Sequence, residues 1–396
     1  MNFPPRNITG LPEPDKASLD HSLRVENAIR AAIRDAGGTL SFSRFMHMAL
    51  YEPGLGYYVA GQQRFGAGGD FVTAPELGSL FGQCLASQID QIMTHLKEQG
   101  TAVDVMEFGA GSGQLAACIL AELEVIEQLP ARYLIVETSP DLRQRQRETI
   151  EKRVPEHLER VEWVDSIPDH SFSGVILANE VLDAMPVELF GIDTEGGVQQ
   201  GCISLEEGGY GWTAVAADDA LAEQVKRFEL MPAYTSELNT ALPGWIAMLA
   251  GWLDNGVVLL IDYGFPRHEY YHPERNGGTL MCHYRHHSHS DPLRLAGIQD
   301  ITAHVDFTAV AEAADDARLD LLGFTNQAGF LIGNGLPQRM AGLMQEDTET
   351  QARINHEIQM LTSPAEMGEL FKVMALGRGY DGELDGFVFR DMRRRL

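Results

Sequence analysis

From about residue 101 onward, short apolar runs alternate with segments of helical character. The runs, which we interpret as strands, span residues 103–108, 133–137, 161–164, 174–180 and 257–263, and each has a polar residue at or next to its carboxyl end. Strands that alternate with helices are typical of a parallel sheet covered on both faces. The pattern therefore predicts an α/β fold with a mostly parallel sheet. Further apolar runs at 319–325 and 387–390 would complete seven strands, and helices are expected over 337–376.

The first 75 residues have a different pattern. A polar, proline-rich arm precedes a predicted helix ending at Ala36, a shorter helix from Ser41 to Leu50, and a glycine- and aromatic-rich loop. Thr73 and Glu76 then have the spacing of a capping box, which predicts a helix running to about residue 98. We expect residues 1–75 to form a helical cap with a covering loop, and residues 76–396 to form the main domain.

Two insertions, at about 191–250 and 265–300, interrupt the main domain. The first contains alternating segments around glycine pairs, which predict hairpins, and we expect the insertions to form a second α+β lobe. The other is rich in histidine, and we interpret it as a solvated loop. We expect no metal site there, because the segment lacks cysteine companions and a helical H-E-x-x-H pattern.

Composition narrows the classes of function. A net charge of −27 over 396 residues argues against nucleic-acid partners, whose phosphates are bound by Lys and Arg; it suits a cationic protein partner or simple solubility equally well. The four widely spaced cysteines predict reduced thiols, and no apolar run reaches the roughly twenty residues of a membrane span. We therefore expect a cytoplasmic protein without membrane partners. The sequence leaves its oligomeric state open, a homodimer being one possibility.

The stretch from Asp104 to Leu115 predicts a cofactor site. A strand leads into Gly109, Gly111 and Gly113 and then into a helix start, so the backbone can approach a ligand and offer unpaired N–H groups. A dinucleotide fold would need G-x-G-x-x-G, which makes a dehydrogenase the weaker interpretation. With Glu107 before the glycines, the stretch resembles the first motif of class I methyltransferases, in which a carboxylate attracts the cationic methionine end of S-adenosyl-L-methionine (SAM). A tight turn without chemical meaning is the alternative.

Polar residues at successive strand ends should lie along one edge of the sheet, which is where open α/β folds bind ligands. Glu137 is suitably spaced from the glycine turn to accept from the ribose hydroxyls of a nucleoside. Asp165, or the adjacent backbone at Ser166, is placed to receive the adenine amino group. Asp70 and Thr73 are expected at the rim of the ligand site, although capping and turn formation alone would also explain them.

The stretch Asn179-Glu-Val-Leu-Asp-Ala-Met-Pro186 follows the fourth strand, a position where many SAM enzymes hold the methyl acceptor. Glu180 and Asp183 could hold a guanidinium through charge-assisted hydrogen bonds, and Glu180 could take its proton. The simpler alternative is that Asp183 caps a helix that ends at Pro186.

A series of short motifs occurs in an order typical of one family. They are Tyr51-x-Pro-x-x-Gly-Tyr-Tyr58, Gly69-Asp-Phe-x-Thr-Ala-Pro-Glu76, Glu107-x-Gly-x-Gly-x-Gly113, Glu137-x-Ser-Pro140, Asp165-Ser166, Asn179-Glu-x-x-Asp-Ala-x-Pro186, Ile261-Asp-Tyr-Gly264, Thr302-Ala-His-Val-Asp-Phe307 and Met367-Gly-Glu-Leu-Phe371. On these motifs, nearly the whole chain resembles the MidA family of SAM-dependent methyltransferases, which includes a mitochondrial arginine methyltransferase of respiratory complex I assembly.

The resemblance implies a Rossmann-like class I methyltransferase fold, bound SAM, and a protein arginine as acceptor. By position, it implies cofactor contacts from Gly69, Asp70, Thr73, Glu107, Gly109, Glu137 and Asp165, and acceptor contacts from Asn179, Glu180 and Asp183. A hypothesis of another class is a SAM-binding assembly factor without turnover. Such a factor would have no chemical need for the carboxylates of the site, which favours the enzyme.

Overall fold

The structure is a computed structural model that describes residues 10–60, 73–166, 171–207, 209–343 and 347–396. The chain divides into two compact units. Unit 1 takes in residues up to 71, 183–242 and 267–304, and unit 2 takes in residues 72–182, 243–266 and 305–396. Among the residues described, no helix combines the length and the apolar character of a membrane span.

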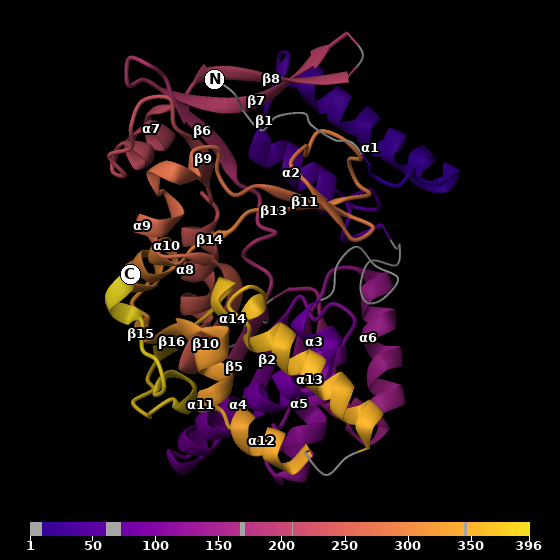
Figure 1. The fold of residues 1–396 in the computed structure, drawn as a ribbon, viewed down its shortest axis with the longest axis vertical. Helices are drawn as coiled ribbons and strands as arrows, with labels where there is room; N and C mark the ends of the chain where they lie inside the picture. The colour runs from indigo at the N-terminus through magenta and orange to yellow at the C-terminus, as the bar shows by residue number, and fades with distance from the viewer. Residues whose placement is uncertain (1–9, 61–72, 167–170, 208, 344–346) are drawn as a thin grey trace. The chain divides into compact units, whose positions relative to one another are not determined.

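The centre of unit 2 is a mostly parallel sheet with the strand order β15-β16-β10-β5-β2-β3-β4 (Figure 1). The strands from β10 to β4 are parallel, β16 is antiparallel to both of its neighbours, and β14 pairs with β10 outside this order. This is the Rossmann-like sheet that was predicted. Its strands are β2 (Asp104–Phe108), β3 (Tyr133–Val136), β4 (Val161–Val164), β5 (Phe172–Asn179), β10 (Leu253–Phe265), β14 (Val305–Asp306), β15 (Asp320–Asn326) and β16 (Phe371–Arg378).

Helices cover this sheet. Val105, Val175 and Val257 are register partners on adjacent strands, and their side chains join one core cluster with the buried residues of α4 and α5. On the described residues, the helices of unit 2 are α3 (Ala74–Leu77), α4 (Leu80–Glu98), α5 (Gln114–Val125), α6 (Pro140–Arg153), α8 (Leu242–Trp252), α10 (Phe307–Asp316), α11 (Gln327–Gly333), α12 (Leu336–Leu343), α13 (Thr348–Thr362) and α14 (Met367–Leu370), with 3₁₀ turns η1 (Pro155–Arg160), η3 (Asp385–Phe387) and η4 (Arg393–Arg395).

Unit 1 contains the predicted N-terminal helices and hairpins. Its antiparallel sheet has the order β1-β7-β6-β9 with β8 on β7, and a smaller sheet has the order β12-β11-β13. Buried side chains of α1 and α2, including Ile29 and Phe45, form one core with residues of both sheets. The elements are α1 (Lys16–Asp35), β1 (Thr39–Ser41), α2 (Phe42–Tyr51), β6 (Glu188–Ile192), β7 (Val198–Glu206), β8 (Gly209–Ala216), α7 (Asp219–Lys226), β9 (Thr235–Leu238), α9 (Arg267–Tyr270), η2 (Pro273–Arg275), β11 (Met281–Tyr284), β12 (His287–His289) and β13 (Asp300–Thr302).

Three predictions about individual elements are wrong. The last strand of the sheet is β16, within a segment predicted to be helical, whereas residues 385–387 form a 3₁₀ turn. Because β16 is buried along nearly its whole length, its apolar run has no alternation and cannot be told from a buried helix by period. Thr73 makes no side-chain cap, and the helix predicted after it is broken at Gly78. The histidine-rich segment includes the β11–β12 hairpin, so it is not a plain loop.

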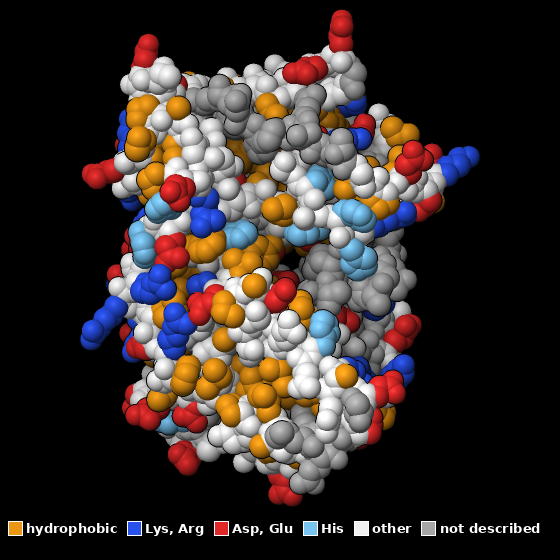
Figure 2. Space-filling view, viewed as in Figure 1, with side chains coloured by type: hydrophobic (Ala, Val, Ile, Leu, Met, Phe, Trp, Pro, Cys, Tyr) orange, Lys and Arg blue, Asp and Glu red, His pale blue; other side chains and the backbone are white. Residues whose placement is uncertain are grey.

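Acidic side chains project at many separate points of the visible face rather than from one patch (Figure 2). On this face the negative charges are therefore dispersed. A dispersed charge of one sign attracts cations from several directions without by itself defining a binding site.

Gly174 and Gly256 allow neighbouring strands of the sheet to approach closely. A Cβ on Gly174 would lie 1.9 Å from the carbonyl oxygen of Asp104, and the φ of Gly174 is +143°. We therefore expect Gly174→Ala to lower the free energy of unfolding by about 3 kcal/mol, since overpacking costs roughly 1–3 kcal/mol and an unfavourable φ adds to it. Urea unfolding measures this. Gly251→Ala is the control, because its Cβ would meet nothing within 4 Å; equal midpoints for the two variants would contradict the expectation.

Candidate functional site

The glycine turn connects β2 to α5 at the carboxyl edge of the sheet in unit 2. Gly109, Gly111 and Gly113 have φ values of 63°, 53° and 82°, a region that residues with a Cβ occupy only at a cost. A Cβ on Gly113 would lie 2.9 Å from the Cα of Gln146 in α6. Glycine at this position therefore lets α6 pack directly against the turn.

Ser112 fixes the outer side of this turn. Its hydroxyl donates to the carboxylate of Glu76, and its carbonyl accepts from the Thr149 hydroxyl at 2.7 Å. Glu76 thus connects α3 to the turn instead of completing a capping box with Thr73, which starts the second described range. Gly69 and Asp70, which were predicted to contact the cofactor with Thr73, lie outside the described residues.

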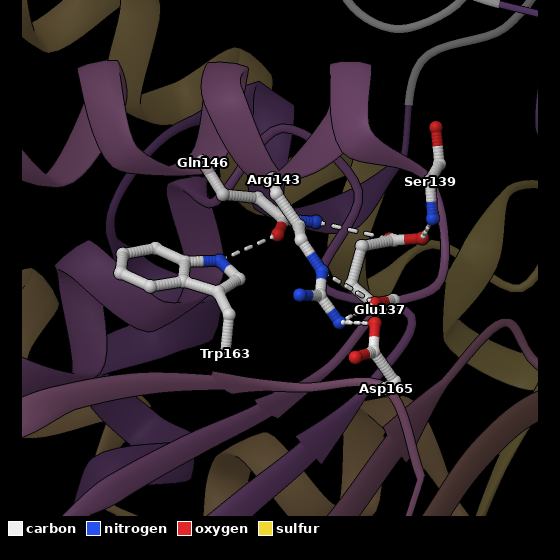
Figure 3. Close-up of polar contacts among 6 residues, drawn as sticks. All are labelled: Glu137, Ser139, Arg143, Gln146, Trp163 and Asp165. Carbon is white, nitrogen blue, oxygen red and sulfur yellow. Dashed lines mark hydrogen bonds and ion pairs between the residues drawn. The ribbon is translucent and has the colours of Figure 1, made fainter.

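The carboxylate of Glu137, just after β3, is held from two sides (Figure 3). Its Oε1 accepts from the backbone N–H of Ser139 at 2.8 Å, and its Oε2 accepts from the side-chain amide of Gln146 at 3.1 Å. Burial raises the pKa of Glu137, and these hydrogen bonds oppose the rise. Since a carboxylate can accept about four hydrogen bonds, each oxygen retains capacity for another donor, such as a hydroxyl.

Gln146 connects Glu137 to the glycine turn. Its Nε2 also donates to the carbonyl of Gly111 at 3.1 Å, and its Oε1 accepts from the indole N–H of Trp163 at 2.9 Å (Figure 3). The side chain is fully buried. All the polar atoms of the amide group are therefore used to fix two parts of the site relative to each other.

Sequence reasoning missed Gln146, although the chain carries a signal for it. The buried residues of α6 are Leu142, Gln146 and Ile150, at the i, i+4, i+8 spacing of one helix face. A glutamine in the apolar stripe of an otherwise charged helix must find hydrogen-bond partners inside the protein. Those partners become known only when the fold brings Trp163 and Gly111 to it.

Asp165 and Ser166 follow β4 and are exposed. The carboxylate of Asp165 accepts from the guanidinium of Arg143 at 2.5 Å, while the Nε of Arg143 donates to the carbonyl of Glu137 at 2.7 Å (Figure 3). The Asp165 side chain is 85% exposed, and an exposed ion pair is worth only about 0–1 kcal/mol. A ligand could therefore replace this contact at little cost. Arg143 is a second residue that sequence reasoning missed.

Glu107 is buried in β2, in register with Ile135 and Leu177 of the adjacent strands. It is 2% exposed, and its Oε2 accepts from the hydroxyl of Tyr133 at 2.7 Å. Burial raises the pKa of Glu107 to about 7, and the hydrogen bond from Tyr133 offsets only part of that rise. Near neutral pH this carboxyl group is divided between two protonation states, and a nearby cation would favour the ionised state.

Asn179 and Glu180 stand at the end of β5. Glu180 has a φ of 52°, which costs about 1–2 kcal/mol for a residue with a Cβ, and its N–H donates to the carbonyl of Ile261 at 2.9 Å. The amide of Asn179 donates to Glu180 at 3.3 Å, while Asn179 Oδ1 is buried with no hydrogen-bond partner among the described residues. Strained backbone beside an unsatisfied polar atom is a reason to expect a ligand contact.

Asp183 belongs to unit 1, whereas Glu180 belongs to unit 2. Asp183 is 5% exposed, and its carbonyl accepts from the N–H of Ala303 at 3.0 Å. No helix follows it, because the next regular element is β6, so the interpretation of Asp183 as a helix cap is wrong. In the same unit, the hydroxyl of Tyr51 donates to the carbonyl of Ala184 at 2.9 Å.

Three features of unit 2 fit a cofactor with an adenosyl group. The glycine turn exposes backbone without Cβ atoms, and Glu137 retains acceptor capacity for ribose hydroxyls. In addition, Oε1 of Gln114, the first residue of α5, is a buried oxygen that lacks a hydrogen-bond partner among the described residues, as does Asn179 Oδ1. A bound ligand that supplies hydrogen-bond donors would satisfy both.

Comparisons with known proteins agree with this geometry. Residues 84–325 match the model of a family of S-adenosyl-L-methionine-dependent methyltransferases. A protein of Burkholderia thailandensis, solved in complex with S-adenosyl-homocysteine (SAH), is 42% identical with a TM-score of 0.93, over 98% of this chain and 100% of its own. The mitochondrial protein arginine methyltransferase NDUFAF7 of Danio rerio is 29% identical over 86% of this chain and 84% of its own length, and the Homo sapiens protein is 27% identical over 86% and 80%.

These relatives correct the prediction of a cytoplasmic protein. The proteins of Danio rerio, Drosophila melanogaster and Homo sapiens that this chain resembles are all named as mitochondrial. The prediction rested on cysteine spacing and on the absence of long apolar runs, and neither property distinguishes these two compartments physically.

We expect Gln146→Leu to weaken SAH binding about 10-fold, because it removes the donor that orients Glu137 and leaves Trp163 without an acceptor. Isothermal titration calorimetry with SAH and with its 2′-deoxy analogue measures the effect. If Gln146 acts through the ribose contact of Glu137, the substitution weakens SAH binding more than analogue binding. Gln144→Leu, on the exposed face of the same helix, is the control. Equal losses for both ligands would contradict this role.

The raised pKa of Glu107 predicts a pH dependence of stability. The pKa of Glu107 is about 7 in the folded protein and about 4.5 in the unfolded chain, which therefore ionises first. The contribution of this group to the free energy of unfolding is full below pH about 4.5 and is lost as the pH rises to about 7. Glu107→Gln should remove this loss, which amounts to about 3 kcal/mol. Urea unfolding of both proteins at pH 5 and pH 8 tests this. A difference between them that does not change with pH would contradict it.

Proposed function

The chain belongs to the MidA family of SAM-dependent methyltransferases, and we propose that it transfers methyl groups to an arginine side chain of a partner protein. The observation that carries the proposal is Glu180, a carboxylate in a left-handed backbone conformation at the end of β5. The names of the arginine methyltransferases of Danio rerio and Homo sapiens, at 29% and 27% identity, support the choice of acceptor.

In this proposal the cofactor lies along the carboxyl edge of the sheet. The backbone of Gly109, Gly111 and Gly113 receives its methionine end near Glu107, and Glu137 accepts from its ribose hydroxyls. Asp165 and Ser166 lie next to the adenine, and the motif that contains Gly69, Asp70 and Thr73 supports these three residues as further cofactor contacts. Bound SAM supplies an electrophilic methyl group on a sulfonium.

Glu180 positions the acceptor and takes up its proton. A carboxylate pairs with a guanidinium through charge-assisted hydrogen bonds, which are about twice as strong as neutral ones and fix the orientation of the group. The amide of Asn179, 3.3 Å from Oε1 of Glu180, and the hydrogen bond from Glu180 N–H to Ile261 limit the movement of this carboxylate. One acceptor nitrogen gains the methyl carbon as the bond from that carbon to sulfur breaks, and the nitrogen then loses a proton to Glu180.

We retain Asp183 as a second carboxylate for the guanidinium, because it belongs to the motif from Asn179 to Pro186. The net charge of −27 supports a partner whose arginine lies in a basic segment, since long-range attraction raises the rate of encounter. A SAM-binding assembly factor is the second candidate function. It is disfavoured because a strained glutamate costs stability and offers no benefit to a protein without turnover.

We expect Glu180→Gln to lower methyl transfer at least 100-fold while SAH binding changes less than about 2-fold, because the variant cannot accept a proton or pair with a cation. Purified protein, radiolabelled SAM and proteins of the same organism provide the assay, with mass spectrometry of the labelled residue. Glu127→Gln is a matched control, since Glu127 also has a positive φ, 57°, and is exposed at a turn of unit 2.

The outcomes separate the hypotheses. If arginine is labelled and the labelling requires Glu180, the proposal is supported. If another residue type is labelled, the choice of acceptor is overturned. If wild-type protein binds SAH and transfers no label to any protein, the assembly factor is the correct interpretation. Full transfer by the Glu180→Gln variant would show that another group holds the acceptor.

A further inference from the structure

Three ligand-type side chains gather at the end of α5 that lies away from the glycine turn. Glu124 is in the last turn of α5, and Glu156 and His157 are in η1, the 3₁₀ turn that precedes β4. One carboxylate oxygen from each glutamate and one imidazole nitrogen all lie within 4.8 Å of one another. A helix of 12 residues rises about 1.5 Å per residue, so this cluster is roughly 15 Å from the cofactor turn.

His157 distinguishes this cluster from an ordinary group of surface carboxylates. Its side chain is buried, with 5% of the residue exposed, whereas Glu124 and Glu156 are exposed. Its Nε2 is a buried atom that completes no hydrogen bond with a described residue. Its contact with Oε2 of Glu124 at 3.1 Å lacks the direction of a hydrogen bond, and a buried polar atom without a hydrogen bond costs about 1–3 kcal/mol, so such an atom calls for a further ligand.

The separation of the ligand atoms matches two ligands of one metal ion. Nε2 of His157 lies 3.1 Å from Oε2 of Glu124, a distance short enough for an ion pair but without the direction of a hydrogen bond. Zinc binds nitrogen and carboxylate oxygen at about 2.0–2.2 Å, which places two adjacent ligands about 2.8–3.6 Å apart between octahedral and tetrahedral angles. A simple imidazolium–carboxylate pair would instead direct its N–H at the oxygen.

We propose that Glu124, Glu156 and His157 bind a divalent transition-metal ion of the zinc type. One imidazole nitrogen with two carboxylate oxygens suits zinc and its neighbours, whereas magnesium and calcium prefer oxygen ligands alone. Three protein ligands leave at least one position for water. The ion joins the end of α5 to the turn before β4, two segments that are far apart in the sequence, and so adds to the stability of unit 2.

The backbone holds His157 in place for this role. The His157 N–H donates to the carbonyl of Val154 at 3.0 Å, and Pro155 begins the 3₁₀ turn. The backbone at His157 is therefore fixed and its ring is buried before the ion binds, while the two exposed glutamates can adjust to it. A site with one fixed and two adjustable ligands binds at a lower entropic cost than one made entirely of mobile side chains.

Calorimetric titration of the full-length protein with zinc chloride tests the proposal. Histidines elsewhere in the chain, such as those from His268 to His289, add nonspecific zinc uptake to the total, so the comparison between variants is decisive. We expect His157→Gln and the double variant Glu124→Gln/Glu156→Gln each to lose one equivalent of zinc or to bind it at least 10-fold more weakly, since even outer-shell partners of metal ligands are worth about 10- to 100-fold. Glu159→Gln, an exposed position in the same turn, is the matched control.

Two further measurements complete the test. Zinc should raise the melting temperature of the wild type and of Glu159→Gln more than that of the double variant, and magnesium chloride should raise none of them. SAH binding should be unchanged in the double variant, which checks its fold and separates this proposal from the proposed function. Equal zinc stoichiometry and affinity in the wild type and in both altered proteins would overturn the metal site. If His157→Gln does not fold, the double variant still decides.

Discussion

The close approach of α6 to the glycine turn is the constraint on which the candidate site depends. With no Cβ on Gly113, the backbone of α6 at Gln146 can come within reach of the turn, and the amide of Gln146 then holds both the carbonyl of Gly111 and the carboxylate of Glu137. One backbone contact thus sets the relative position of two groups that come from different strands. A larger residue at position 113 would move α6 away and separate those two groups.

Burial away from water sets the pKa values of two carboxylates of the site. Glu107 and Glu137 both have raised pKa values because burial disfavours their charged forms. Their hydrogen bonds differ, however: Glu107 accepts one from Tyr133, whereas Glu137 accepts one from a backbone N–H and one from a side-chain amide. Glu107 is therefore the group that responds most strongly to a nearby cation, and Glu137 is the one kept ready to accept hydrogen bonds.

Two further features of unit 2 depend on rigid secondary structure, one at the carboxyl end of β5 and one beside the carboxyl end of α5. At Glu180, a hydrogen bond to β10 maintains a backbone conformation that a glutamate would otherwise avoid. At His157, a 3₁₀ turn holds a buried ring whose nitrogen has no hydrogen-bond partner among the described residues. In both places, rigid secondary structure holds a residue in a conformation or an environment that costs free energy and that the local sequence would not adopt alone.

The sequence by itself determined the class of fold, the glycine turn and the polar ends of the strands, because these depend on local periodicity and on the absence of side chains at particular positions. It did not determine β16, whose buried run lacks a period, or the partners of Gln146, Glu107 and Asp165, which lie on other elements. It also gave no sign that Asp183 belongs with unit 1, or that Glu124 and His157 meet. Tertiary structure decided these points, since hydrogen bonding and burial between segments distant in the chain depend on how the whole sheet and its helices pack.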